Sequence, residues 1–136
     1  LISDRDVAGV IHCADPKTGI DIYLGIGGAP EGVLAASALR CIGGQMQTRL
    51  ITDTEELRAR TLKMGIKDPK KKYQIEDMVR GDCLFAATGV TTGPMLSGVK
   101  FGKDVIETET VVVRSVTGTV RRVLAEHRQF DKFHLD

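Results

Sequence analysis

The sequence predicts one α/β (α+β) domain, residues 1–136, in which helices flank a mixed β-sheet. The chain has 136 residues, of which 42% are hydrophobic, enough for a single core. Residues 104–114 and 119–125 alternate strongly in β-branched side chains, which is typical of strands. Residues 30–42 instead repeat apolar side chains at helical spacing. These patterns place both kinds of element in one domain.

Near the start of the chain, a predicted strand leads through a glycine turn into a predicted helix. Residues 20–26 alternate between apolar and other side chains, which is the pattern of a half-buried strand. Residues 30–42 carry the helical stripe, which ends at Gly43 and Gly44. Pro30 suits the first helical turn because its missing N–H would have had no partner there.

The turn itself, residues 25–32, has two interpretations. The start of a helix offers unpaired N–H groups and a positive dipole end, and Gly27 and Gly28 would let an anion approach the backbone. Alternatively, the glycines serve only the turn or close packing, and Glu31 complements the helix dipole. The segment lacks the third glycine of a dinucleotide fingerprint and the Gly-Lys-Ser/Thr of a P-loop. Dinucleotides and nucleoside triphosphates are therefore disfavoured as ligands.

Two carboxylates precede the first apolar segment of the chain. Asp4 and Asp6 stand just before residues 7–11, which are predicted to form a strand. On an extended chain both side chains would point to the same side, where they could coordinate a hard cation or accept hydrogen bonds from sugar hydroxyls. A polar turn before a strand is the alternative interpretation.

The remaining segments are predicted to be scaffold. Thr52 and Glu55 have the spacing of a capping box, which opens a helix that runs to about Met64 and stops at Gly65. Further along, we expect a solvated turn at residues 70–72, a helix at 75–79, a buried strand at 83–87 and a hairpin connection at 115–118.

Composition and charge exclude several classes of function. The formal net charge is +1, from 19 basic and 18 acidic residues, and only 4% of residues are aromatic, so neither nucleic acid nor a membrane is expected as a partner. No apolar stretch reaches membrane-spanning length and no signal peptide is visible, which favours a cytoplasmic location. Cys13, Cys41 and Cys83 lack the spacing of a zinc or redox motif and are expected to be buried, reduced thiols.

Seven segments in order along the chain carry a resemblance to a known family. They are residues 4–9, 18–21, 25–33, 40–44, 77–81, 85–91 and 113–121. In sequence and spacing they are similar to the class II fructose-1,6-bisphosphatases, the GlpX family. The resemblance implies the layered α/β/α/β/α fold of the lithium-sensitive phosphatases and a metal-dependent reaction of gluconeogenesis, hydrolysis of the 1-phosphate of fructose 1,6-bisphosphate to fructose 6-phosphate and phosphate. The alternatives are an enzyme that also accepts sedoheptulose 1,7-bisphosphate, and a non-catalytic phosphate-ligand-binding or subunit-contact module.

The same resemblance implies roles for individual residues. Glu31 would be a ligand of Mn²⁺ or Mg²⁺, and Gly28 would contact the sugar bisphosphate. Asp4, Arg5 and Asp6 match an Asp-Gly-Asp segment that contacts substrate, although the family usually has glycine where this chain has Arg5. The catalytic residues and other metal ligands are expected in an N-terminal part of the same enzyme that is absent from this chain. The chain alone is therefore expected to be inactive, and the enzyme is expected to be a homo-oligomer.

Overall fold

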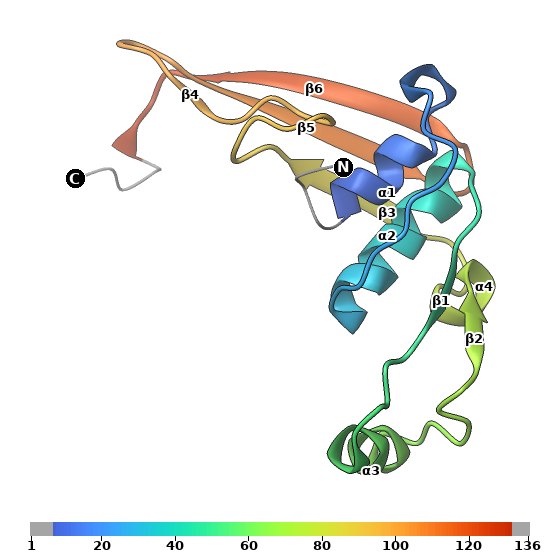
Figure 1. Ribbon diagram of the computed structural model, residues 1–136. Helices are drawn as coiled ribbons and strands as arrows, with labels where there is room; N and C mark the ends of the chain where they lie inside the picture. Colours follow the sequence, from blue (N-terminus) through green and yellow to red (C-terminus); the bar gives the residue numbers. More distant parts are fainter. Residues whose placement is uncertain (1–6, 132–136) are drawn as a thin grey trace.

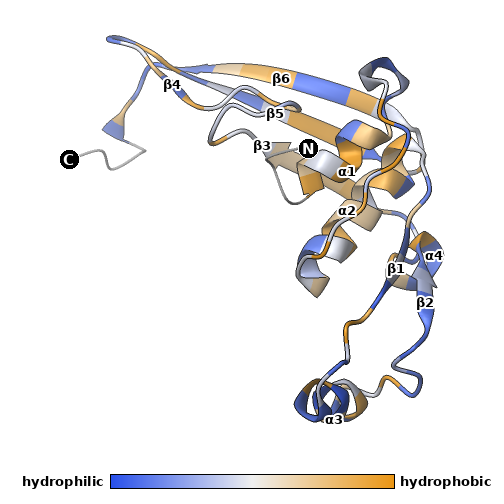
Figure 2. Cartoon of the chain, in the orientation of Figure 1, coloured by the Kyte–Doolittle hydropathy of each residue, from blue (hydrophilic) through white to orange (hydrophobic). Residues whose placement is uncertain are grey.

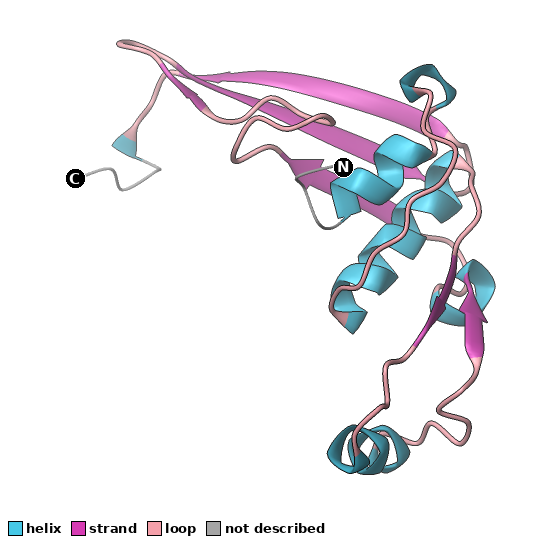
Figure 3. Ribbon diagram, in the orientation of Figure 1, coloured by secondary structure: helices cyan, strands magenta, loops and turns pink. Residues whose placement is uncertain are grey.

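A computed structural model describes residues 7–131 of the chain and shows a curved antiparallel sheet with helices against one face (Figure 1, Figure 3). In chain order the elements are α1 (Val7–Cys13), a 3-10 helix (Pro16–Thr18), α2 (Ala29–Ile42), β1 (Gln47–Arg49), α3 (Glu55–Lys63), β2 (Lys72–Gln74), α4 (Ile75–Met78), β3 (Leu84–Thr88), β4 (Lys100–Phe101), β5 (Ile106–Arg114) and β6 (Thr119–His127). None of the helices within residues 7–131 is both long and apolar enough to cross a membrane.

The main sheet is organised around β5. Strands β3 and β4 pair with one edge of β5 and β6 pairs with the other, whereas β1 and β2 form a separate two-stranded ribbon. Every pairing among the described residues is antiparallel. The predicted combination of sheet and flanking helices is confirmed, but the strand directions are antiparallel rather than mixed.

The long hairpin of β5 and β6 forms as the sequence predicts. Its connection is the expected four-residue turn, with Arg114 opposite Thr119 in the register. Gly118 closes the turn with φ of 58°, and its N–H donates to the Arg114 carbonyl over 2.9 Å. Glycine suits this position because other residues rarely adopt a positive φ.

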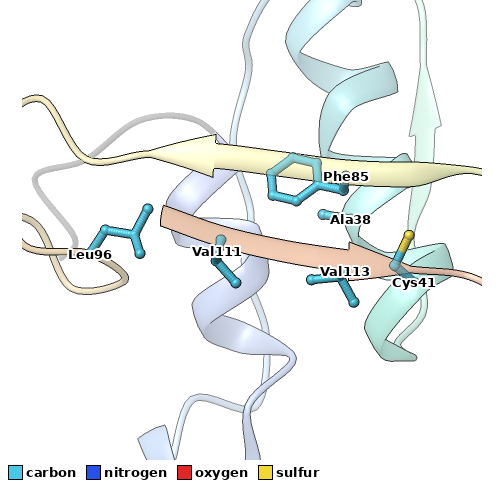
Figure 4. Packing of buried hydrophobic residues seen from close by; sticks show 6 residues of the cluster. All are labelled: Ala38, Cys41, Phe85, Leu96, Val111 and Val113. Carbon is cyan, nitrogen blue, oxygen red and sulfur yellow. The ribbon is translucent and has the colours of Figure 1, made fainter. Parts of the chain in front are cut away.

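Helix α2 packs against the sheet through small side chains. Its buried residues include Ala35, Ala36 and Ala38, which let the helix backbone approach the strands closely. The core between α2 and the sheet is shown in Figure 4, and its buried members are Ala38, Cys41, Phe85, Leu96, Val111 and Val113. A second cluster, Ala36, Leu39, Ile75 and Val79, joins α2 to α4. These contacts hold α2 firmly on the scaffold.

The strand predicted at residues 7–11 is wrong, because this segment is the helix α1. Val7 and Ile11 pack on the first core cluster, whereas Val10 and Ala14 pack on the second. Each pair is four residues apart, the spacing of one helical face. A short apolar run suits a strand or a buried helix equally, and contact with α2 decides between them.

The strand predicted at residues 20–26 is also wrong, because the segment is an extended loop (Figure 3). Its apolar side chains Ile22, Leu24 and Ile26 are 68%, 84% and 82% exposed. None of the strands among residues 7–131 pairs with this segment. A strand needs a neighbour for its backbone hydrogen bonds, so alternation alone does not produce one.

Helix α3 starts later than its predicted capping box. Thr54, not Thr52, is the cap, because its hydroxyl accepts the Leu57 N–H over 3.2 Å. The helix stops as expected before Gly65, whose φ is 85°. The predicted helix at residues 75–79 and strand at 83–87 are confirmed within one residue as α4 and β3, but the strand is not buried as predicted, because Phe85 is the one buried residue of β3.

The three cysteines differ in burial and two of them meet. Cys41 is 3% exposed, whereas Cys13 and Cys83 are only half-buried, so the expectation of three buried thiols is correct for Cys41 alone. The Sγ atoms of Cys41 and Cys83 lie 3.5 Å apart. Burial, together with the neighbouring Cys83, raises the pKa of Cys41 from 9.0 to about 11.

We expect Cys41 to be the slowest thiol to react with iodoacetamide at pH 7.5, because it is buried and protonated. Peptide mass spectrometry of briefly alkylated protein should find Cys13 and Cys83 modified first, and in urea all three should react. Equal labelling of all three thiols in the folded protein would contradict this assignment of Cys41.

The raised pKa of Cys41 also makes the free energy of unfolding depend on pH. Its contribution to stability is fully present below about pH 9 and is lost as pH rises through about 11.

Candidate functional site

Glu31 is an exposed carboxylate in the first turn of α2. The helix begins directly after Gly28, with Pro30 in its first turn as predicted. Among residues 7–131, Glu31 has no hydrogen bond or ion pair through its side chain. Its oxygens are therefore available to an external ligand.

Gly28 makes room for this carboxylate. A Cβ placed on Gly28 would collide with Oε2 of Glu31 and lie 3.0 Å from its Cδ. The φ of Gly28 is −69° and its ψ is 151°, an extended conformation open to any residue. The turn therefore does not require glycine for its backbone angles at this position. What the missing side chain provides is space for the Glu31 carboxylate against the backbone.

Replacing Gly28 by Ala is expected to displace the Glu31 carboxylate while leaving the fold intact. The contacting atoms are the far end of a flexible side chain, and an alanine cap costs only about 1 kcal/mol, so the thermal transition should move little. If Glu31 is the metal ligand that the resemblance implies, the metal-dependent activity of the full-length enzyme should fall about tenfold or more, because a misplaced ligand group loses its geometry.

Gly32→Ala is the matched control for this substitution. Gly32 lies in the same helical turn, and a Cβ there would meet nothing within 4 Å. Alanine should keep activity and stabilise the helix by up to about 1 kcal/mol. If both glycine variants kept full activity, the contact of Gly28 with Glu31 would have no role in the site.

The start of α2 also suits an anion. In this 14-residue helix the first backbone bond of the helical pattern runs from the Gly32 N–H to the Gly28 carbonyl over 3.0 Å. The N–H groups before Gly32 have no partner within the helix, and the positive end of the helix dipole lies beside them. Two kinds of group thus lie next to each other at the start of α2. The Glu31 carboxylate can bind a cation, and the N–H groups can bind an anion.

The described residues do not hold a metal by themselves. Within residues 7–131 no three His, Cys, Asp or Glu side chains are grouped closely enough to bind one. Glu31 offers one hard oxygen donor of the kind that Mg²⁺ and Mn²⁺ prefer, so it suits the part of one ligand among several. Asp4, Arg5 and Asp6 lie outside the described residues.

A cavity lies at the other end of α2. It measures about 350 Å³ and is lined by Leu39, Arg40, Gly43, Gly44, Ile75, Glu76, Asp82 and Ser115. About 12 residues of helix separate Gly43 from Glu31, or roughly 18 Å at 1.5 Å per residue. The Arg40 Nε donates to the Gly81 carbonyl over 2.9 Å, which joins α2 to the loop before β3. This cavity is therefore separate from the Glu31 site.

Glu109 in β5 has a structural role that no sequence pattern indicates. Its carboxylate accepts the Ser97 N–H over 2.7 Å and a hydrogen bond from Arg122 Nη1 over 3.2 Å, and these two contacts lower its pKa. These two hydrogen bonds hold the loop between β3 and β4 against the sheet. Its partners are 12 and 13 residues away along the chain, so no local pattern could have revealed them.

Known proteins resemble this chain over nearly all of its length. The family model described as bacterial fructose-1,6-bisphosphatase, glpX-encoded, matches residues 1–127. A D-fructose 1,6-bisphosphatase class 2/sedoheptulose 1,7-bisphosphatase of Synechocystis sp. is 40% identical over 140 residues, which cover 93% of this chain and 41% of that protein. The fructose-1,6-bisphosphatase class 2 of Haemophilus influenzae is 39% identical over 148 residues, with 98% and 44% covered.

This chain thus spans about two fifths of the length of these relatives. Both relatives carry the name of a class 2 bisphosphatase, and the family model covers all but nine C-terminal residues. The motifs around Glu31 lie inside the matched region. The chain belongs to the GlpX family of class II fructose-1,6-bisphosphatases.

Proposed function

We propose that this chain supplies one wall of the active site of a metal-dependent fructose-1,6-bisphosphatase, which releases the 1-phosphate and leaves fructose 6-phosphate. Glu31 is a metal ligand in this proposal, Gly28 contacts the substrate, and Asp4, Arg5 and Asp6 bind the sugar. The observation that carries the proposal is the unpartnered Glu31 carboxylate, held over the bare α-carbon of Gly28 at the start of α2.

Each group has a distinct chemical task. Bound Mn²⁺ or Mg²⁺ supplies an activated water and neutralises charge on phosphate oxygens. Glu31 fixes the position of the cation relative to α2, and the free N–H groups of the first turn orient the phosphate. The carboxylates of Asp4 and Asp6 accept hydrogen bonds from sugar hydroxyls. This division leaves water activation to groups outside this chain.

The rest of the site comes, in this proposal, from an N-terminal part of the same enzyme. The relatives are more than twice as long as this chain, and the residues described here contain no complete metal site. The exposed apolar segment at residues 20–26 leads directly into the Glu31 turn. We assign this segment to pairing with the missing part, which would convert it into the strand that its alternation indicates.

A bifunctional enzyme is the second candidate. The Synechocystis sp. relative carries the names of both bisphosphatases, and it matches this chain as well as the Haemophilus influenzae relative does. Fructose 1,6-bisphosphate and sedoheptulose 1,7-bisphosphate share the phosphate-bearing end that the start of α2 would contact. Specificity then depends on the remainder of the sugar.

A cytoplasmic enzyme is consistent with the three free cysteines.

The test is phosphate release by the full-length protein against both bisphosphates and their monophosphates, with Mn²⁺, with Mg²⁺ and with a chelator. We expect metal-dependent release from fructose 1,6-bisphosphate and none from fructose 6-phosphate. Comparable rates with sedoheptulose 1,7-bisphosphate would identify the bifunctional enzyme. Binding of a bisphosphate without any hydrolysis would instead identify a non-catalytic module and overturn the proposal.

A further inference from the structure

Cys41 and Cys83 form a pair of thiols that the proposed active site does not use. Their Sγ atoms lie 3.5 Å apart, and the two cysteines are 42 positions apart in the chain. Cys41 belongs to the last turn of α2, and Cys83 comes directly before β3. Hydrophobic residues cover much of α2 (Figure 2), and Cys41 is a buried member of the core between this helix and the sheet. About ten residues of helix, or roughly 15 Å at 1.5 Å per residue, separate Cys41 from Glu31.

Hydrogen bonds around the two cysteines hold them in this position. The Cys83 N–H donates to Ser115 Oγ over 2.9 Å, and the Cys83 carbonyl accepts the Ser115 N–H over 3.0 Å. On the helix, Arg40 Nε donates to the Gly81 carbonyl over 2.9 Å, which ties the residue before Cys41 to the same segment. The fold therefore keeps the two thiols close together.

The distance between the two sulfur atoms suits the formation of a disulfide. An S–S bond measures about 2.05 Å, so the sulfur atoms must approach by about 1.5 Å, which small rotations of the two side chains can supply. The hydrogen bonds that such rotations break are weak. Cys41 Sγ donates to the Cys83 carbonyl and Cys83 Sγ donates to the Ser37 carbonyl, both over 3.7 Å.

The two cysteines differ in accessibility. Cys83 is half-buried, so a small oxidant reaches its sulfur first, whereas Cys41 is 3% exposed. Burial and the neighbouring Cys83 raise the pKa of Cys41 to about 11, so Cys41 stays a protonated thiol at neutral pH. An accessible sulfur beside a protected one is the arrangement of a cysteine that is oxidised and a second cysteine that resolves it.

We propose that Cys41 and Cys83 are a reversible oxidation site, at which hydrogen peroxide joins α2 to the segment before β3 through a disulfide. The Cys83 sulfur first takes one oxygen from the peroxide and becomes a sulfenic acid, while the O–O bond breaks and one water leaves. The Cys41 sulfur then attacks the Cys83 sulfur, so that the S–S bond forms and the S–O bond breaks. The departing hydroxide takes the proton of the Cys41 thiol and leaves as a second water. Two thiols and one peroxide thus give one disulfide and two waters.

The disulfide has two consequences for the protein. It protects Cys83, because a sulfenic acid that reacts with a thiol is not oxidised further to the irreversible sulfinic acid. It also closes a loop of 42 residues and so restrains α2 against the sheet. The proposal concerns the scaffold and does not depend on whether Glu31 binds a metal.

The test is oxidation of the full-length protein by a few equivalents of hydrogen peroxide at pH 7.5. The protein is then alkylated, digested with trypsin without reductant and analysed by mass spectrometry. Trypsin cleaves after lysine and arginine, so the two cysteines fall in peptides 41–49 and 81–100. We expect these peptides to be joined, at about 2 Da below their summed masses, and to separate in dithiothreitol. Because proximity favours this pair, the joined peptides should be about tenfold or more as abundant as any peptide joined through Cys13.

The Cys41→Ala variant distinguishes this chemistry from a contact that only packs the core. Without the second thiol, Cys83 should be oxidised further, and peptide 81–100 should gain about 32 Da, two oxygens that dithiothreitol does not remove. Cys13→Ala is the matched control, because Cys13 is also half-buried but its Sγ donates to the Ile20 carbonyl over 3.6 Å. This variant should still give the joined peptides.

The unmodified protein decides the question even if Cys41→Ala does not fold. Electrophoresis without reductant should show the oxidised protein at the mass of a single chain, since the proposed bond lies within one chain. Absence of the joined peptides at every peroxide concentration that leaves the protein folded would overturn the proposal. Their appearance only in urea, or only in a cross-linked dimer, would overturn it as well.

Discussion

The Glu31→Gln variant of the full-length enzyme is expected to lose most of its Mn²⁺- or Mg²⁺-dependent phosphate release. Substituting partners that only orient a metal ligand costs about 10- to 100-fold in metal affinity or activity, so losing a ligand's charge should cost about 100-fold or more. Glutamine keeps the size of the side chain but removes the negative charge that binds the cation. The measurement is the initial rate of phosphate release across a metal titration.

The fold should tolerate this substitution. Glu31 is exposed and makes no side-chain bond among the described residues, so the loss is limited to its interaction with the helix dipole, about 0.3–1 kcal/mol. Glu56→Gln is the matched control, because Glu56 is also an exposed carboxylate in the first turn of a helix, α3. We expect it to retain activity. An unchanged metal titration in Glu31→Gln would remove this residue from the site.

The Leu24→Ala variant is expected to have little effect on the stability of the short chain but a large effect on that of the full-length enzyme. In the 136-residue chain Leu24 is 84% exposed, so its truncation should change the free energy of unfolding by less than about 0.5 kcal/mol. If the remaining polypeptide covers residues 20–26, the same truncation in the full-length enzyme removes a buried leucine. The cost should then be about 2–5 kcal/mol, measured by urea unfolding.

Leu124→Ala provides the comparison for this experiment. Leu124 on β6 is 80% exposed, nearly the same as Leu24, but it does not adjoin the Glu31 turn. Its truncation should be nearly neutral in both proteins. If Leu24→Ala were neutral in the full-length enzyme as well, residues 20–26 would remain an exposed loop there. The rest of the site would then have to approach Glu31 from another side.

Local patterns predicted the elements whose partners lie nearby in the chain. The hairpin of β5 and β6 was predicted because its two alternating segments pair with each other across a four-residue turn. Helix α2 was predicted because Pro30, an apolar stripe and two glycines mark its start, face and end. In both cases the information needed lies within about 25 residues of sequence.

Patterns failed where the partner is distant or absent. Residues 7–11 form a helix that packs against α2, some 20 residues later, and Val7 and Val10 each join one of the two core clusters. Residues 20–26 have the alternation of a strand but no neighbouring strand among those described. Cys41 and Cys83 meet across 42 residues of sequence, and no spacing rule would have paired them. Each of these outcomes depends on long-range packing, which a local window does not contain.

The sequence by itself determined the family, the β5–β6 hairpin, helix α2 and the candidate residues Gly28 and Glu31. Motifs and local periodicity sufficed for these because they depend only on residues that are close together in the chain. The tertiary structure decided how Gly28 and Glu31 are placed relative to each other. It showed that Gly28 does not need a glycine's backbone freedom, and that the absent side chain leaves space for the Glu31 carboxylate. It also placed β1, β2 and α3 away from the two core clusters (Figure 1). Such features depend on distances between atoms that only the folded chain brings together.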